Sequence, residues 1–340
     1  MNISQKLSTL KSFKLSFGVK FILLFILLIL SIIAALCIGS VRLNFVDIIN
    51  GKNGMDIDIL LHLRLPRVLG AVLAGAALST AGVIIQAVLS NHMASPNIIG
   101  VNSGAGLGAV IVLCIFPSAI SFLPLAAFLG ALFSCLIIYI ISRNASTDRI
   151  SIALIGIAIG SILSGVINFI KSLFPNTAYD TQMYSIGSLS GVSNSLLAFA
   201  FISIILTIFI TLVFSRYLDI LSLGDSSAHS LGLNVKNTKL LMLTLSAILA
   251  GSAVSFAGLI GFVGLLVPHI ARRIVGTSHK KLVPSSAIIG AILVVLCDLL
   301  GRTLFSPYEI PVGIILSLIG GPFFIFLILI KKGRGFYDRG

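Results

Sequence analysis

Residues 64–86 read RLPRVLGAVLAGAALSTAGVIIQ. After Arg64 and Arg67, no charged residue follows until beyond position 89, so this run of about twenty residues can cross ~30 Å of hydrocarbon as a helix. Pro66 is well placed at the start of that helix, where a missing N–H is tolerated. Arginine is among the costlier residues to place near a bilayer. The side of the membrane that these two arginines face therefore bears on what they do.

The rest of the chain repeats this pattern. Of 340 residues, 57% are apolar and only 10% are charged, with a mean hydropathy of +1.15, whereas soluble domains carry about 25% charged residues. We therefore predict an all-α, polytopic membrane protein of about ten transmembrane helices. The expected spans are residues 19–38, 65–89, 99–116, 119–141, 150–170, 195–214, 239–257, 260–274, 284–302 and 311–330.

The first expected span follows a lysine-bearing arm and could be taken for a signal peptide. Its apolar run, FILLFILLILSIIAALCIGS (residues 21–40), is longer than a usual signal core and has no small-x-small cleavage site. We predict an uncleaved helix. Ten spans place both termini on one side of the membrane.

The basic residues indicate which side that is. With the N-terminus in the cytoplasm, 17 of the 23 Lys and Arg fall inside, as the positive-inside rule expects. The net charge of +13 thus serves orientation, and no basic soluble domain is available to bind nucleic acid. The six basic residues predicted outside are Arg42, Lys52, Arg64, Arg67, Lys171 and Arg302. Arg64, Arg67 and Arg302 lie at helix ends rather than in loops.

The sequence carries no recognisable catalytic or metal-binding constellation. The four cysteines occupy separate apolar spans without a CxxC, the five histidines are scattered, and there is no HExxH, GxSxG or Walker A motif. We predict no catalytic residue, no metal site and no cofactor bound by this chain. Asp298 is the main ionisable candidate for an ion relay inside a span, but Arg302 follows one turn later, which favours an Asp–Arg pair.

Glycines recur at four-residue spacing in two of the expected spans. They are Gly100, Gly104 and Gly108 in one span and Gly156 and Gly160 in another. Small residues at this spacing let membrane helices approach closely. We predict a tight helical bundle at these positions rather than an active site.

Two polar interruptions stand between spans on the cytoplasmic side. Residues 90–104 form an expected turn, and residues 215–238 are too polar to span. Within the second, apolar residues spaced for short amphipathic helices are Leu223, Ala228, Leu231 and Leu233. Gly224 and Gly232 would end those helices. A plain solvated loop is the alternative. We favour a docking surface, because a carrier without an ATP site or an ion relay needs an external motor.

Five motifs follow one another in order: RLPRVLGAVLAGAALSTAGVIIQ, ASPNIIGVNSGAGLGA, LGDSSAHSLGL, GLIGFVGLLVPHIAR and EIPVGIILSLIGGPFFIFLI. Together they resemble the FecCD-type permeases, the membrane subunits of bacterial ABC importers for iron–siderophores, haem and vitamin B12. The likeness covers residues from about 20 to 330. It implies the type II importer architecture: two permease subunits (a homodimer or a paralogous heterodimer), a cytoplasmic ATPase dimer and an extracytoplasmic solute-binding protein.

The resemblance also implies roles for individual residues. It assigns binding-protein docking to Arg64 and Arg67 in RLPR and to Arg302 after CDLLG. It assigns ATPase coupling to Gly224, Asp225, Ala228, Leu231 and Gly232, and a cytoplasmic gate to Asn91, Met93, Ser146 and Thr147. The family's gate turn usually reads Asn-Pro-Leu-Ala, whereas His92 replaces the proline here, which leaves the shape of this gate open.

The expected domain is therefore a single transmembrane permease over residues 1–340 in the bacterial cytoplasmic membrane. It has a cytoplasmic arm (1–18), a coupling loop (215–238) and a cytoplasmic tail (331–340). Most of the family carries iron–siderophores, so that cargo is expected; haem and vitamin B12 stay open. An ion-coupled secondary transporter would need an embedded relay and no docking loop, and a membrane enzyme would need catalytic residues. We predict a transport subunit whose ATP is hydrolysed on another chain.

Overall fold

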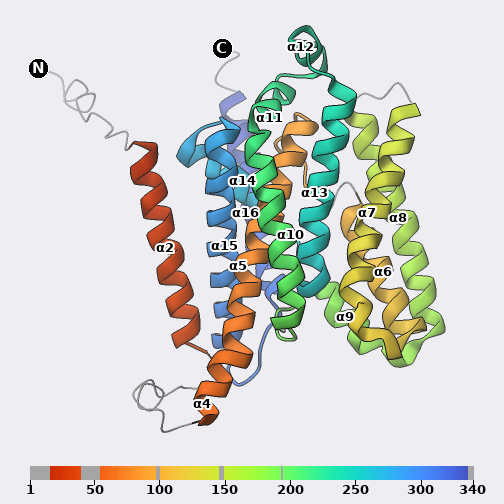
Figure 1. The fold of residues 1–340 in the computed structure, drawn as a ribbon, viewed down its shortest axis with the longest axis vertical. Helices are drawn as coiled ribbons and strands as arrows, with labels where there is room; N and C mark the ends of the chain where they lie inside the picture. The colour runs from red at the N-terminus through yellow and green to blue at the C-terminus, as the bar shows by residue number, and fades with distance from the viewer. Residues whose placement is uncertain (1–15, 40–53, 97–99, 145–148, 193, 336–340) are drawn as a thin grey trace, which may run out of the picture.

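The computed structural model describes residues 16–39, 54–96, 100–144, 149–192 and 194–335, and every regular element in these ranges is helical (Figure 1). The α-helices are α2 (Phe17–Cys37), α4 (Gly54–Asp58), α5 (Leu65–Val88), α6 (Val101–Ile115), α7 (Leu123–Asn144), α8 (Arg149–Leu173), α9 (Ala178–Ile186), α10 (Asn194–Val213), α11 (Ser215–Ser222), α12 (Asp225–Ser230), α13 (Val235–Ala257), α14 (Val263–Val275), α15 (His279–Thr303) and α16 (Val312–Gly335). A π-helix, η1 (Ile59–Arg64), leads into α5. The 3-10 helices η2 (Pro117–Phe122) and η3 (Pro175–Thr177) precede α7 and α9. The prediction of an all-α protein is confirmed.

A helix occupies each of the ten predicted spans, but the helices differ in length. Among the described residues, five are long and apolar enough to cross a membrane, or six if α10 and α11, which meet at a 62° bend, form one span. Helix α14 has only 13 residues, so at ~1.5 Å per residue it reaches about 20 Å. The predicted span began at residue 260, but the helix begins at Val263, directly after Phe262, whose φ angle is positive.

Helix α5 forms the centre of the bundle and is buried along most of its length. It packs against α10, α13, α14 and α15. Two of its glycines touch neighbouring backbone: a methyl group at Gly75 would collide with Gly290 of α15, and one at Gly82 would collide with Gly264 of α14. Between membrane helices, such close packing supplies the attraction that hydrophobic burial supplies in water.

Helices α6, α7 and α8 stand together at one side of the bundle (Figure 1). A methyl group at Gly104 of α6 would collide with the Gly130 carbonyl of α7, and Gly100, at the start of α6, lies against Gly156 and Gly160 of α8. The predicted packing role of these glycines is confirmed.

Three helix ends meet inside the protein and satisfy one another's backbone groups. The chain leaves α9 at Gly187 and α13 at Gly258, with φ angles of 84° and 69°. The Leu259 N–H donates to the Tyr184 carbonyl at 3.0 Å, and the Gly313 N–H donates to the Gly187 carbonyl at 3.1 Å. A bilayer offers no partner for a free backbone group, so irregular backbone is tolerated only where the protein itself pairs it or water reaches it.

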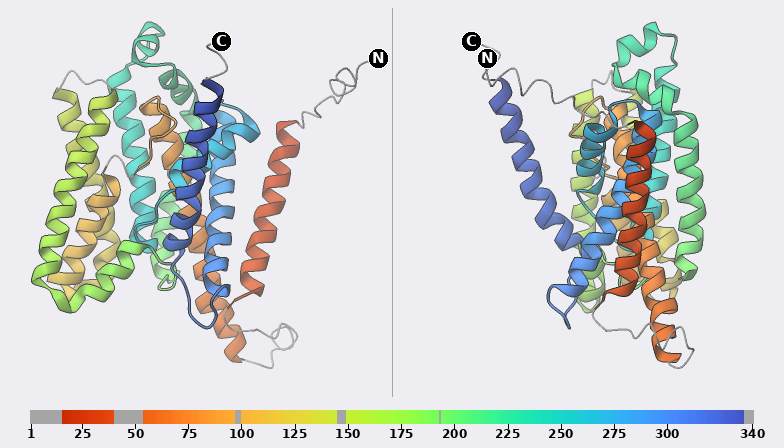
Figure 2. Two further views of the ribbon diagram at one scale, coloured as in Figure 1. Left: turned by 180° about the vertical axis from the view of Figure 1, so that it is seen from behind. Right: turned by 90° about the vertical axis from the view of Figure 1, so that its left-hand side faces the viewer.

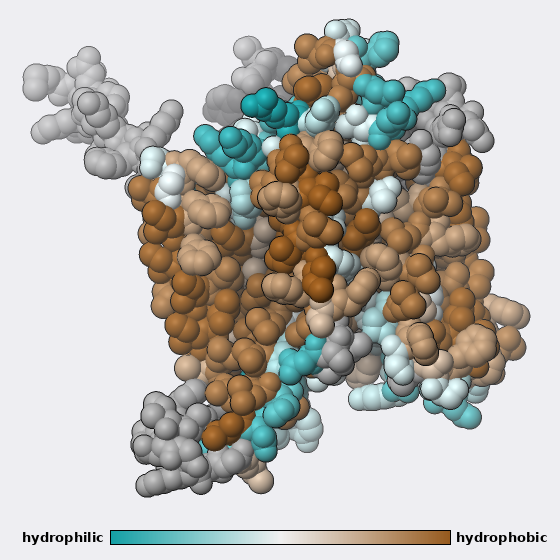
Figure 3. All heavy atoms as spheres, viewed as in Figure 1, coloured by the Kyte–Doolittle hydropathy of each residue, from teal (hydrophilic) through white to brown (hydrophobic). Residues whose placement is uncertain are grey.

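The two ends of the bundle differ. Helices α11 and α12 lie at one end, called here the α12 end, and α4 lies at the other, called the α4 end. The start of α2 and the end of α16 both lie toward the α12 end, and α16 leans away from the other helices (Figure 2). The face drawn in Figure 3 has a broad apolar middle, with hydrophilic residues gathered toward the two ends.

Candidate functional site

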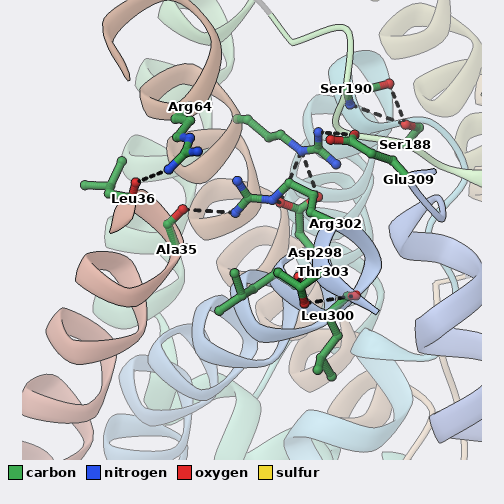
Figure 4. A network of polar contacts seen from close by, with 12 residues as sticks. Ala35, Leu36, Arg64, Ser188, Ser190, Asp298, Leu300, Arg302, Thr303 and Glu309 are labelled. Atoms are coloured by element: carbon green, nitrogen blue, oxygen red, sulfur yellow. Dashed lines mark hydrogen bonds and ion pairs between the residues drawn. The ribbon is translucent and has the colours of Figure 1, made fainter. Parts of the chain in front are cut away.

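A cluster of charged side chains, drawn in Figure 4, lies where η1 leads from α4 into α5 and where α15 ends. Arg302 Nε lies 3.1 Å from Asp298 Oδ2 within α15, which confirms the predicted pair. Arg67 of α5 reaches the same carboxylate, with 3.0 Å between Nε and Oδ1. Its Nη1 also lies 2.6 Å from Glu309 Oε2, in the loop before α16. The cluster therefore ties α5, α15 and that loop together.

Two of the arginines also hold the end of α2. Arg64 donates from Nη1 to the carbonyls of Leu36 (2.8 Å) and Cys37 (3.2 Å), and Arg302 donates from Nη2 to the carbonyl of Ala35 (3.1 Å). The last carbonyls of a helix have no partner within it and carry partial negative charge, so cations stabilise them. Arg64 and Arg302 are only 5% and 3% exposed.

All three arginines predicted to dock a binding protein thus contact their own chain. Apart from the Asp298–Arg302 pair, the sequence did not predict these contacts. The accessible part of the cluster is Arg67, whose side chain is 12% exposed, with Glu309 at 34%. Sequence reasoning missed Glu309, although a signal was present: it is one of only ten acidic residues and opens the EIPVG motif. The docking role stays a prediction.

The loop predicted to couple with an ATPase forms α11 and α12 at the α12 end. Gly224 and Gly232 have φ angles of 109° and 80° and end the short helices as predicted. Ala228, predicted to face a partner with Leu231, is instead fully buried, because the apolar side of α12 packs back on the chain. Leu231 and Leu223 are 62% and 63% exposed. These two leucines, rather than Ala228, present an apolar surface.

Two polar contacts connect this loop to the rest of the bundle. Asp225, one of the predicted coupling residues, forms an ion pair of 2.5 Å with Lys239 of α13. The Ser90 hydroxyl, in the turn after α5, donates to the Leu221 carbonyl of α11 at 3.0 Å. A movement of α11 would therefore be transmitted to the turn after α5 through this hydrogen bond.

That turn contains two of the four predicted gate residues. The Asn91 Oδ1 accepts a hydrogen bond from the Met93 N–H at 2.9 Å, and both residues are exposed, as is His92. The asparagine thus forms a local turn where the family's proline is missing. The other two predicted gate residues, Ser146 and Thr147, lie outside the described residues, and the gate role stays a prediction.

A cavity of about 810 Å³ opens between α6, α8, α9 and α16. Its wall is mixed, with isoleucine, leucine and glycine beside serine and asparagine. The helix ends that meet at Gly187 and Gly258 border it, through Ile186 and Leu259. The sequence did not predict this cavity. The sequence contained only a weak indication of the cavity, namely that the polar residues at positions 164, 168 and 171 share one face of α8.

These features define a class of protein. Helices that are interrupted inside an apolar bundle, with their ends lining a cavity of cargo size, are typical of membrane transport proteins. Comparison with known proteins agrees. The model of the FecCD transport family matches residues 27–330. The chain belongs to this family and is a membrane transport permease.

Several characterised proteins are similar over most of the chain. The Fe(3+)-citrate import system permease protein YfmE of Bacillus subtilis (strain 168) is 38% identical over 87% of this chain and 90% of its own length. The hemin transport system permease protein HmuU of Yersinia pestis is 39% identical with the same coverage. A solved metal-chelate type ABC transporter in an inward-facing conformation superposes with a TM-score of 0.82, at 28% identity, over 92% of this chain and 98% of that one.

The charged cluster yields a stability prediction. Replacing Asp298 with Asn leaves the buried Arg302 and the partly buried Arg67 without their shared carboxylate, and breaking a buried ion pair costs about 3–5 kcal/mol. We expect the purified Asp298→Asn protein to unfold at a clearly lower temperature in detergent. Asp58→Asn is the matched control, since that carboxylate is at the same end and its side chain is 76% exposed. Equal unfolding temperatures for the two variants would contradict the structural role of the cluster.

Proposed function

We propose that this chain is the membrane-spanning permease subunit of a binding-protein-dependent ABC importer for iron chelates, with iron–siderophore complexes as the first candidate. The cavity between α6, α8 and α16 carries this proposal, because its volume of about 810 Å³ suits a chelate rather than a bare ion. Relatives named for Fe(3+)-citrate and hemin support the cargo class. Haem is the second candidate, and vitamin B12 has no such support among these relatives.

Energy would come from a separate ATPase dimer at the α12 end. Leu223 and Leu231 support this, because two leucines more than 60% exposed at the tip of a polar loop suit a protein partner. The Ser90–Leu221 hydrogen bond would pass the motion to the turn after α5. An ion-coupled carrier is disfavoured, because Asp298, the buried carboxylate of the charged cluster, is held between two arginines. ATP hydrolysis would then take place outside this chain.

The α4 end would receive the solute-binding protein. Arg67 is the accessible member of the predicted docking set, and its pairs with Asp298 and Glu309 hold the guanidinium in place. Arg64 and Arg302 would act behind it by fixing α2. An acidic group on the binding protein would then meet Arg67 beside Glu309.

This assignment makes the α12 end cytoplasmic and the α4 end extracytoplasmic, in a bacterial cytoplasmic membrane. Both termini would be cytoplasmic, in agreement with the basic residues between the end of α14 and the start of α15, where His279 contacts Asp219 of α11: Arg272, Arg273, Lys280 and Lys281. The chain would form one permease domain, with residues 1–18 and 331–340 as its cytoplasmic arm and tail. A second permease subunit, identical or paralogous, would complete the pathway.

The proposal predicts that transport depends on ATP. Vesicles that contain the permease and its ATPase, supplied with binding protein and ferric chelate outside, should accumulate iron only when ATP is present inside. Uptake driven by a proton or sodium gradient without the ATPase would contradict the proposal.

A variant of the coupling loop belongs in the same assay. Leu231→Glu places a charge on the exposed apolar tip, so we expect loss of ATPase copurification or ATP hydrolysis without uptake. Asn237→Glu is the control, because it adds the same charge at an exposed position in the first turn of α13, where an acid is tolerated. Normal uptake by Leu231→Glu would place the ATPase elsewhere. Ala228 is a poorer target, since its burial makes any large substitution disrupt the loop itself.

Docking of the binding protein gives a further prediction. Arg67→Gln removes the accessible charge, and we expect affinity for the binding protein to fall by about 2 kcal/mol at low salt, the lower range for a partly buried pair. Charge reversal at Arg64 is less informative, because it would also free the end of α2. Lys236→Gln, at the α12 end, is the control for loss of one charge. Binding measured in nanodiscs at two salt concentrations checks this, and unchanged affinity at low salt would leave Arg67 with a structural role only.

A further inference from the structure

Lys171 lies on the wall of the 810 Å³ cavity, in the last turn of α8. Its Nζ lies 3.1 Å from the Ser185 hydroxyl of α9, which in turn donates to the Thr181 carbonyl. Among the described residues, Lys171 forms no ion pair. An ammonium group is therefore held at the cavity by a neutral partner, and its charge is not compensated there.

Anchoring at the lipid surface does not account for this position. Lysines at helix ends often extend toward the headgroups, but the ammonium of Lys171 bonds to a serine on a neighbouring helix. The neighbours that face outward are Phe169 and Leu173, which are 63% and 59% exposed. The charged group lies on the other side of α8, toward the cavity.

Lys171 begins a line of polar groups along the cavity. Asn168 and Ser164 follow it at one-turn steps on the same face of α8, and both line the cavity. A second cavity of about 560 Å³ also has Ser164 and Asn168 in its wall and continues along α8 to Ser161. Among the described residues that line either cavity, Lys171 is the only charged one.

The first turn of α6 adds to the same wall. Helix α6 begins after Gly100 inside the bundle, and Asn102 and Ser103 line the cavity. The first N–H groups of a helix carry partial positive charge. Asn102 is only 9% exposed, and its side-chain oxygen has no hydrogen-bond partner among the described residues. That oxygen is a buried acceptor and offers nothing to an anion, so the attraction on this side comes from the first N–H groups of α6. The described residues of the wall include no carboxylate.

We propose that Lys171 makes this cavity selective for anionic chelates, which present carboxylate or phenolate oxygens, over neutral chelates of the same size. The inference rests on the proposed import of ferric chelates and adds the charge of the cargo. The positive group and the start of α6 attract the anion, while Asn168 and Ser164 supply neutral contacts as it moves inward. No carboxylate among the described residues of the wall opposes it.

The test uses the intact permease–ATPase complex in nanodiscs, without binding protein, so that selectivity belongs to the permease. Binding of an anionic ferric tricarboxylate and of a neutral ferric trihydroxamate is measured with radioactive iron. Lys171→Met should weaken binding of the anion about tenfold and leave the neutral chelate unchanged, as expected for loss of one charge contact. Lys171→Arg should restore anion binding. Lys280→Met, exposed at the α12 end, is the matched control.

Salt dependence of the unmodified complex gives a second readout that needs no variant. Binding of the anion should weaken as ionic strength rises, and binding of the neutral chelate should not. Equal changes for both chelates, in the variant or with salt, would overturn the role of Lys171. Failure of the proposed function would look different. If the unmodified complex takes up no ferric chelate with ATP and binding protein, the assignment as an importer fails. ATP-driven uptake without selection by charge refutes only the role of Lys171.

Discussion

A lipid bilayer offers no hydrogen-bond partner to a free backbone group, and this constraint governs where the chain may be irregular. The described breaks lie inside the bundle: after α9 at Gly187, between α13 and α14 at Gly258, and at the start of α6 after Gly100. Two of them pair with each other and with the start of α16. These same segments border the cavity. The cavity and the irregular backbone are thus one feature of the fold.

Charge follows a related rule at the α4 end. Arg64 and Arg302 are almost fully buried, and each has a carbonyl or carboxylate as partner. The cluster fixes α2 and joins α5 to α15. Arg67 is its accessible member. A docking surface that includes these paired side chains would already be rigid before a partner protein binds. Lys171 is different, because its partner is neutral and its charge faces the cavity.

The sequence was sufficient for the helices and for contacts close along the chain. Apolar runs located a helix at every predicted span, four-residue glycine spacing predicted close packing, and the one-turn separation predicted the Asp298–Arg302 pair. Contacts between distant segments were not predictable in this way. The capping of α2 by Arg64, the burial of Ala228 and the closeness of Lys171 to Ser185 depend on how the helices are placed in space. Helix α14 begins three residues later than predicted, because hydropathy does not register the positive φ angle of Phe262.

The central claim is that the cavity beside α8 is the transport pathway and opens to one side at a time. Ser164 is an exposed residue of its wall, so Ser164→Cys can report access. The background is Cys37→Ser, because Cys37 is the exposed cysteine and the other three are buried. A membrane-impermeant thiol reagent is applied to either side of vesicles that contain the permease–ATPase complex. We predict labelling from one side without nucleotide and from the opposite side when a non-hydrolysable ATP analogue is bound. Labelling from both sides in both states, or from neither, would contradict the account.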